Sequence, residues 1–212
     1  MLFRSELTNN HYQVIPNVVD IENFTLKPAR ADHAGTCFIH VSCFDEKSKN
    51  IKGLIDAFKQ LLKEQPQITL KLIGDGPDKV TTEDYVKQLG LSGKITFTGE
   101  LTGEALIQAY HLADALVLSS HYETFAIVLA EAMACGLPVI STPVGVAPDL
   151  IKKETGLLTA SSKADDIKKA LELFLRTKNT FSPEEIRNSV ISRFSKETVG
   201  KALANIYAKV LT

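Results

Sequence analysis

Residues 115–148, ALVLSSHYETFAIVLAEAMACGLPVISTPVGVAP, decide the fold of this chain. The stretch opens with an apolar run, Ala115 to Leu118, which is too short for a helix and is followed by two serines, so we expect a buried strand. A polar loop follows, in which Thr124 is the expected N-cap of an alanine-rich helix. Gly136 lies where that helix would need a left-handed terminating residue. Residues 138–141 (PVIS) then indicate the next buried strand.

These expected elements follow one another directly as strand, loop, helix, turn and strand, which is the order of one βαβ unit. The first loop of such a unit lies at the carboxyl edge of a parallel sheet, where ligands of open α/β folds bind. The helix after the loop offers free N–H groups and the positive end of its dipole, which suit a phosphate or a sugar hydroxyl. The stretch therefore predicts a ligand site as well as a fold.

Two carboxylates frame this expected helix. Glu123 lies just before it, and Glu131 lies two turns into it. Taken singly, Glu123 would favour the helix dipole and Glu131 would be a solvated surface residue, and for either alone we prefer that interpretation. Glu131, however, lies within the apolar run VLAEAMA, where a charge is unfavourable unless it is exposed or paired. The combination of the two favours a functional site.

The composition is that of an ordinary globular domain. The chain has 212 residues, 44% hydrophobic and 23% charged, with a formal net charge of −1, which suffices for one domain of generous size. This charge predicts no nucleic-acid partner and at most a peripheral association with membranes. Three cysteines and five histidines without ligand spacing favour a reducing, cytoplasmic setting and no metal site. No stretch is apolar enough to span a bilayer, and no signal peptide is visible.

The rest of the chain alternates strand and helix patterns. Further strands are expected at residues 36–42, 68–73, 95–98 and 156–158. Helices are expected at about 51–62, 80–89, 102–111, 148–152, 163–176, 183–194 and 196–210, with Asn50 a possible N-cap of the first. This order predicts a doubly wound, mainly parallel, Rossmann-like α/β sheet of about six strands with a C-terminal helical tail. We expect a connector at 1–35, the Rossmann-like domain at 36–180 and C-terminal helices at 181–212.

A glycine-rich turn, Gly74-Asp75-Gly76-Pro77, lies between an expected strand and an expected helix. A dinucleotide-binding fingerprint would need glycine at the sixth position, where Lys79 stands, so NAD binding is poorly supported. The favoured interpretation is a tight turn that needs glycine torsions.

The segment ETFAIVLAEAMACGLPVIST resembles the signature of the retaining glycosyltransferases of family 4, which have the GT-B fold. The spacing of Glu123 and Glu131 matches that signature, and the other matching residues are Phe125, Ala132, Gly136, Pro138 and Val139. The resemblance runs over about residues 12–158 and is strongest at 115–148. It implies the donor-binding half of an enzyme that transfers a hexosyl group from a UDP- or GDP-type sugar to an unknown acceptor, with no cofactor and no metal.

The resemblance also implies roles for individual residues. Glu123 would contact hydroxyls of the donor sugar and Lys49 the diphosphate, and these two would be the catalytic residues. Glu131 would bind the ribose hydroxyls. The other donor-binding residues would be Thr124, the backbone of Phe125, Ala126 and Ile127, Gly74 and Gly76 near the base, and Ser42 and Cys43 after the first strand. A lysine and a helix N-terminus could stabilise the departing nucleoside diphosphate without a metal.

Two departures from the family pattern bear on function. Cys43 stands where the family has a phosphate-binding arginine, so a bidentate contact would be lost. The family also has a first Rossmann-like domain, whereas only about 35 residues precede the first expected strand. We therefore expect residues 1–35 to be a connector from a missing N-terminal GT-B domain, and the chain alone to be unable to transfer sugar. A non-catalytic nucleotide-sugar-binding module and a GT-B nucleotide-sugar epimerase stay open as alternatives.

Overall fold

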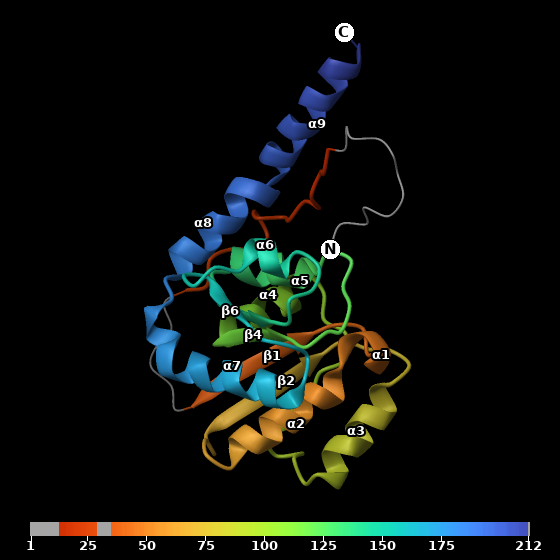
Figure 1. Ribbon diagram of the computed structural model, residues 1–212, viewed down its shortest axis with the longest axis vertical. Coiled ribbons are helices and arrows are strands. Elements are labelled where there is room, and N and C mark those ends of the chain that lie inside the picture. The colour runs from red at the N-terminus through yellow and green to blue at the C-terminus, as the bar shows by residue number, and fades with distance from the viewer. Residues whose placement is uncertain (1–12, 29–34, 212) are drawn as a thin grey trace.

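The computed structural model of the protein describes residues 13–28 and 35–211 (Figure 1). This part of the chain forms a six-stranded sheet in the order β3-β2-β1-β4-β5-β6, and every neighbouring pair is parallel. The strands are β1 (Thr36–Val41), β2 (Ile68–Ile73), β3 (Ile95–Phe97), β4 (Ala115–Leu118), β5 (Val139–Ser141) and β6 (Gly156–Leu158). The strand order reverses between β1 and β4, as in a doubly wound Rossmann-like fold. The predicted fold class is confirmed.

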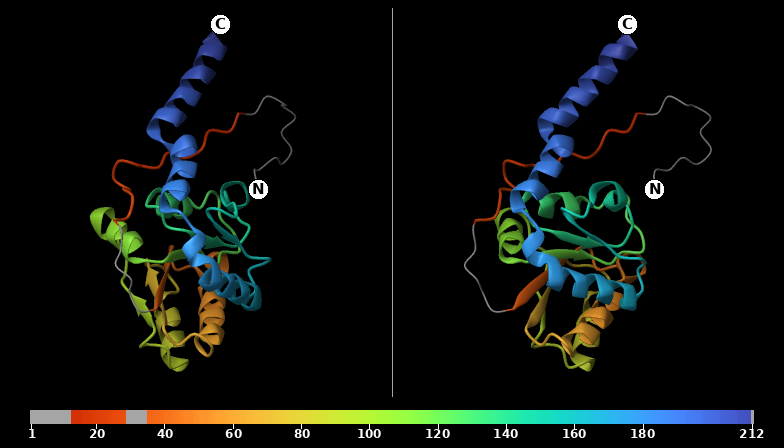
Figure 2. Two further views of the ribbon diagram at one scale, coloured as in Figure 1. Left: turned by 90° about the vertical axis from the view of Figure 1, so that its left-hand side faces the viewer. Right: turned by 60° about the vertical axis from the view of Figure 1, so that its left-hand side comes forward.

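Helices cover both faces of the sheet (Figures 1 and 2). They are α1 (Glu46–Lys49), α2 (Ile51–Leu62), α3 (Lys79–Gln88), α4 (Gly103–Leu112), α5 (Ile127–Ala134), α6 (Ala147–Leu150), α7 (Ala164–Thr177), α8 (Pro183–Phe194) and α9 (Lys196–Leu211), with a 3₁₀ turn at Lys178–Thr180. One apolar core lies under α2 and α7, and the other lies under α4, α5 and α8. The helix α9 extends away from the sheet.

Strand β4 shows why both faces must be covered. All four of its residues, ALVL, are buried, and its alternate side chains enter different cores, since Ala115 and Val117 join one cluster and Leu116 and Leu118 the other. A continuous apolar run of this kind is typical of a parallel strand between two helical layers. The sheet thereby fixes where its carboxyl edge, and the loops along it, must lie.

The structure differs from the sequence expectation at the start of two helices. Helix α5 begins at Ile127 with Ala126 as its N-cap, so Thr124 does not cap it. Asn50 precedes α2 but makes no capping hydrogen bond with its side chain. A one-turn helix, α1, which is not among the expected helices, lies between β1 and α2. All three differences lie next to the carboxyl edge of the sheet.

Candidate functional site

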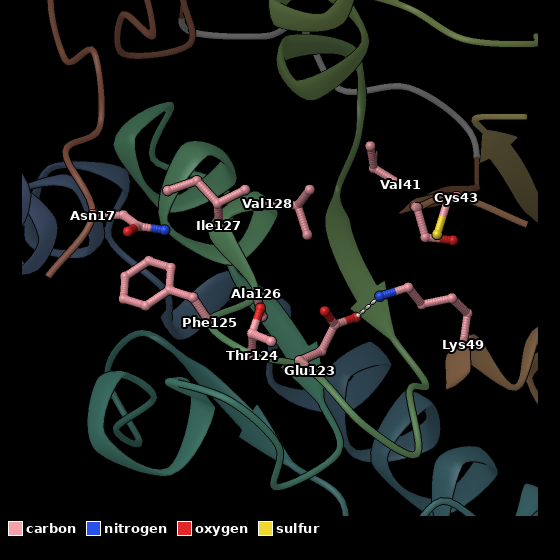
Figure 3. A pocket seen from close by; sticks show the side chains of 11 residues that line it. Asn17, Val41, Cys43, Lys49, Glu123, Thr124, Phe125, Ala126, Ile127 and Val128 are labelled. Atoms are coloured by element: carbon pink, nitrogen blue, oxygen red, sulfur yellow. Dashed lines mark hydrogen bonds and ion pairs between the residues drawn. The ribbon is translucent and has the colours of Figure 1, made fainter. Parts of the chain in front are cut away.

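A pocket of about 240 Å³ opens at the carboxyl ends of β1 and β4, where the strand order reverses (Figure 3). Its lining comes from the end of β1, from α1, from the loop that leads into α5, and from Asn17. The lining residues are Asn17, Val41, Ser42, Cys43, Lys49, Glu123, Thr124, Phe125, Ala126, Ile127 and Val128. The predicted site residues therefore meet here, apart from Glu131, Gly74 and Gly76.

An ion pair lies in this lining. The Lys49 ammonium donates to Glu123 Oε1 at 2.7 Å, and the two side chains are only 14% and 12% exposed. The Ser120 hydroxyl donates to the same carboxylate oxygen at 2.7 Å. Figure 3 shows the two side chains pointing toward each other, with their ion pair drawn as a dashed line. Because both groups are largely shielded from water, their attraction is screened much less than that of a surface pair. Both residues were predicted site residues, but their pairing was not predicted.

The backbone on both sides of Lys49 is held by hydrogen bonds. Asn50 has a left-handed conformation, with φ 52° and ψ 46°, and its side-chain amide donates to the carbonyls of Ser119 (3.1 Å) and Ser162 (2.8 Å). The Ser119 hydroxyl in turn donates to the Lys49 carbonyl at 2.9 Å. The Asn50 side chain therefore joins three loops at this edge instead of capping α2. Such cross-linking fixes the position from which the lysine side chain starts.

The start of α5 turns toward the pocket. Ala126 has φ 70° and ψ 56°, a conformation that is uncommon for a residue with a Cβ. The Phe125 carbonyl accepts from the Val146 N–H at 2.9 Å, which anchors the bend. The N–H groups in the first turn of a helix have no acceptor within the helix. Ile127 and Val128 line the pocket, so this amide-rich end of α5 offers an anion-binding edge.

His40 lies behind the lining and pairs with Ser42, which is part of the lining. Ser42 was a predicted site residue, but its pairing with His40 was not predicted. His40 is fully buried, and its Nδ1 lies 2.9 Å from the Val117 carbonyl while its Nε2 lies 2.8 Å from Ser42 Oγ. Burial lowers the pKa of His40 to about 4, because the charged imidazolium would lose its hydration. The available signal was an ionisable residue within the mainly apolar strand TCFIHV.

Glu131 lies outside the pocket lining. Since α5 begins at Ile127, Glu131 is little more than one turn into the helix, not two. The Tyr110 hydroxyl donates to its Oε2 at 3.1 Å. Burial raises the pKa of Glu131, and the bond from Tyr110 partly opposes that rise. Glu131 is thus a half-buried carboxylate that is paired with Tyr110 of α4.

The glycines Gly74 and Gly76 also lie outside the lining. Both have positive φ, 137° and 156°. A Cβ on Gly74 would lie 1.8 Å from the Ser42 carbonyl oxygen, and one on Gly76 would lie 2.6 Å from the Phe44 nitrogen. These positions need glycine because the turn packs directly against the loop after β1. This agrees with the interpretation of a tight turn, and it makes the two glycines a support for the pocket wall.

Within the described part of the chain, no group of three or more histidine, cysteine or carboxylate side chains is placed to hold a metal ion. Cys43 is an exposed free thiol at the pocket. Among the helices that the structure describes, none has the length and apolar character that crossing a bilayer requires.

Comparisons with known proteins identify chains that are similar to this one in sequence and in fold. N-acetyl-alpha-D-glucosaminyl L-malate synthase of Bacillus anthracis is 32% identical over 176 residues, which are 82% of this chain and 45% of that protein. The crystal structure of Anabaena HepE in complex with UDP superposes with a TM-score of 0.80 at 23% identity, covering 93% of this chain and 57% of that one. The C-terminal domain of LpcC, a glycosyl transferase group 1 family protein from Francisella tularensis, superposes with a TM-score of 0.70 at 25% identity, covering 84% of this chain and 99% of that domain.

The chain spans about half the length of the curated relatives that it matches. The family model for glycosyl transferases group 1 matches residues 26–193, which is most of the sequence and includes the whole sheet. By that match, the chain belongs to the glycosyl transferases group 1 family.

Proposed function

We propose that this chain is the donor-binding half of a retaining glycosyltransferase of the family 4 type, which transfers a hexosyl group from a UDP- or GDP-sugar to an acceptor. The observation that carries the proposal is the shielded Lys49–Glu123 pair beside the amino end of α5. A nucleotide sugar has an anionic diphosphate next to a hydroxyl-rich ring. The pocket offers a cation and helix amides for the first and a carboxylate for the second.

The charges fit the chemistry of group transfer. When the bond between sugar and diphosphate breaks, negative charge grows on the departing nucleoside diphosphate. The Lys49 ammonium and the first N–H groups of α5 can stabilise that charge from fixed positions. The Glu123 carboxylate can accept hydrogen bonds from sugar hydroxyls, and bonds to a charged acceptor are stronger than neutral ones. The two groups would therefore separate on binding, Lys49 holding the diphosphate and Glu123 the sugar beside it.

The size of the pocket supports the proposal that a second domain completes the donor site. Its volume of about 240 Å³ is below the roughly 300–1,000 Å³ of sites that enclose drug-sized ligands. A nucleotide sugar would thus be only partly covered here, and we propose that an N-terminal GT-B domain, joined through a connector at 1–35, covers the rest and carries the acceptor contacts. We propose 36–180 as the donor domain, with residues 181–212 packing on or beyond it.

The relatives support the same reading. Anabaena HepE has been crystallised with UDP and with UDP-glucose, and the Bacillus anthracis relative is named as a glucosaminyl malate synthase.

Glu131 would then serve the ribose hydroxyls, which requires the ligand to reach it past the pocket lining and to share it with Tyr110. The free cysteines and the net charge of −1 support a cytoplasmic location with at most peripheral membrane contact.

A non-catalytic donor-binding module is the second candidate. The observation that favours it is Cys43, a thiol at the pocket where a second phosphate-binding cation would be expected. An epimerase would use the same cleft, and analysis of the products formed from a nucleotide sugar separates it from a transferase.

Titration calorimetry with UDP, GDP and their sugars tests the proposal. Lys49→Met should weaken binding of UDP or GDP at least about tenfold, because a charge-assisted phosphate contact is lost. The matched control is Lys47→Met, since Lys47 lies on the same turn but outside the lining. Circular dichroism should show that each variant is folded. Equal losses in both variants, or no binding by the unmodified chain, would contradict the proposal.

A further inference from the structure

His40 and Ser42 stand on one side of β1 and its extension, two residues apart, and only Ser42 reaches the pocket. His40 is completely buried. Both of its ring nitrogens are used, one by the Val117 carbonyl of the neighbouring strand β4 and the other by the Ser42 hydroxyl. A buried polar side chain so close to the pocket, yet absent from its lining, can act on a ligand only through Ser42.

The chemistry of the partners fixes where the protons lie. A backbone carbonyl can only accept, so Nδ1 must carry a hydrogen to make the 2.9 Å contact with Val117. The charged groups that face His40 are Glu123 and Lys49, and they act on its charge in opposite directions, while burial dominates and favours the neutral ring. A neutral ring with hydrogen on Nδ1 has a bare Nε2. Nε2 must then accept from the Ser42 hydroxyl across 2.8 Å.

We propose that His40 is a positioning residue that fixes the direction of the Ser42 hydroxyl, so that Ser42 meets a bound donor only as a hydrogen-bond acceptor. This inference rests on the proposed donor-binding function of the pocket. With its hydrogen committed to His40, Ser42 Oγ has only lone pairs left for the ligand. It would attract a hydroxyl or N–H of the nucleotide sugar and would repel a phosphate oxygen. The pair thus directs the diphosphate toward Lys49 and away from the end of β1.

Two substitutions of His40 separate this role from a merely structural one. In His40→Asn, the shorter amide can replace Nδ1–H and keep the bond to Val117, but it cannot reach Ser42. In His40→Gln, the side-chain carbonyl can take the place of Nε2 and accept from Ser42, but the bond to Val117 is lost. A structural role predicts that the less stable variant binds worse. Positioning predicts that His40→Asn binds a UDP-sugar about fivefold more weakly, the value of one ordinary hydrogen bond, while His40→Gln stays near wild-type affinity whatever its melting temperature.

Ser42→Ala completes the design as a double-mutant cycle. It should weaken binding about fivefold by itself, and adding His40→Asn should cause no further loss, because the two residues act through one contact. Losses that multiply, or a His40→Gln variant that binds as poorly as His40→Asn, would overturn the inference.

The wild-type protein also supplies a test that needs no variant and no ligand. Two-bond ¹H–¹⁵N correlation spectra should show His40 neutral, with its hydrogen on Nδ1, at pH 7. The opposite tautomer or an imidazolium would overturn the inference even if the chain binds UDP-sugars. If the chain showed the expected tautomer but bound no nucleotide, the proposed function and the ligand-directing role of Ser42 would be refuted. Only the hydrogen bond from Ser42 to His40 would then stand.

Discussion

Glu123→Gln is expected to strengthen the binding of UDP and to reduce the advantage that a UDP-sugar has over it. In the free protein the Lys49 ammonium is paired with Glu123 at 2.7 Å, and both side chains are largely shielded. A bound diphosphate has to compete with that carboxylate for the ammonium. The glutamine keeps nearly the same shape and can still accept from Ser120, which now donates to Glu123 Oε1, but it removes the competing charge.

Coulomb's law for a close pair of charges sets the scale of the effect. Two unit charges about 4 Å apart attract by about 4 kcal/mol at the effective dielectric constant of roughly 20 near a protein surface. Desolvation of the two ions offsets much of this attraction. A net release of about 1–2 kcal/mol is therefore expected, which corresponds to UDP binding about 5 to 30 times more tightly. The sugar, in contrast, loses a hydrogen bond to a charged group, so the ratio of UDP-sugar to UDP affinity should fall by about tenfold or more.

Titration calorimetry of UDP and of the matching UDP-sugar measures both changes. The control is Glu104→Gln on α4, which makes the same chemical change at an exposed glutamate outside the lining; it should leave both affinities unchanged. If Glu123→Gln bound UDP no better than the wild type, the idea that the ion pair must open for the diphosphate would be refuted.

Three further predictions concern stability. Ala126→Gly should raise the free energy of unfolding by about 1 kcal/mol, because glycine relieves the φ of 70°, and a thermal melt should show the gain; a lower melting temperature would contradict the strain. Gly136→Ala should lower that free energy by more than about 2 kcal/mol, since φ is 74° and a Cβ would lie 2.6 Å from Leu26. Urea titration measures that change, and Gly200→Ala in α9 is the control. A Cβ on Gly200 would have no atom within 4 Å, so this variant should be neutral or stabilising. The pKa of His40 is lowered from an ordinary 6.5 to about 4 in the folded protein, so on acidification the unfolded state binds the proton first. The free energy of unfolding should therefore fall by about 3 kcal/mol as the pH falls from about 6.5 to 4. His40→Gln should remove that part of the pH dependence in urea titrations, and an unchanged profile would contradict the assignment.

The strands could be predicted because their signals are local. The run ALVL at β4 is apolar throughout and bounded by serines, and a buried parallel strand is the simplest way to place it. Gly136 was expected to have a left-handed conformation, and its φ of 74° confirms that prediction. Helix α2 repeats its apolar residues at helical spacing after Asn50, and the observed helix, Ile51–Leu62, covers that repeat and ends before Pro66.

The start of α5 could not be predicted from local preference. Thr124 is the better N-cap by residue type, but the chain bends two residues later, at Ala126, where the Val146 N–H holds the Phe125 carbonyl. That contact comes from another loop, so no local pattern reports it. The consequence for the site is large, because the amide-rich end of the helix and the position of Glu131 both shift along the chain.

The pairings within the site were also beyond sequence reasoning. Lys49 and Glu123 are 74 positions apart in the sequence. They come together only because β1 and β4, which precede them, are neighbours in the sheet. His40 and Val117 are likewise joined across two strands. The resemblance to family 4 named most of the pocket lining, but it could not show which of its groups were already bonded to one another.

A crystal structure of this chain with a UDP-sugar would test the central claim most directly. We expect the diphosphate within hydrogen-bond distance of Lys49 Nζ and of the first N–H groups of α5, with a sugar hydroxyl on the Glu123 carboxylate and the ion pair opened. A donor bound elsewhere, or one bound at this edge with Lys49 and Glu123 still paired and untouched, would contradict it.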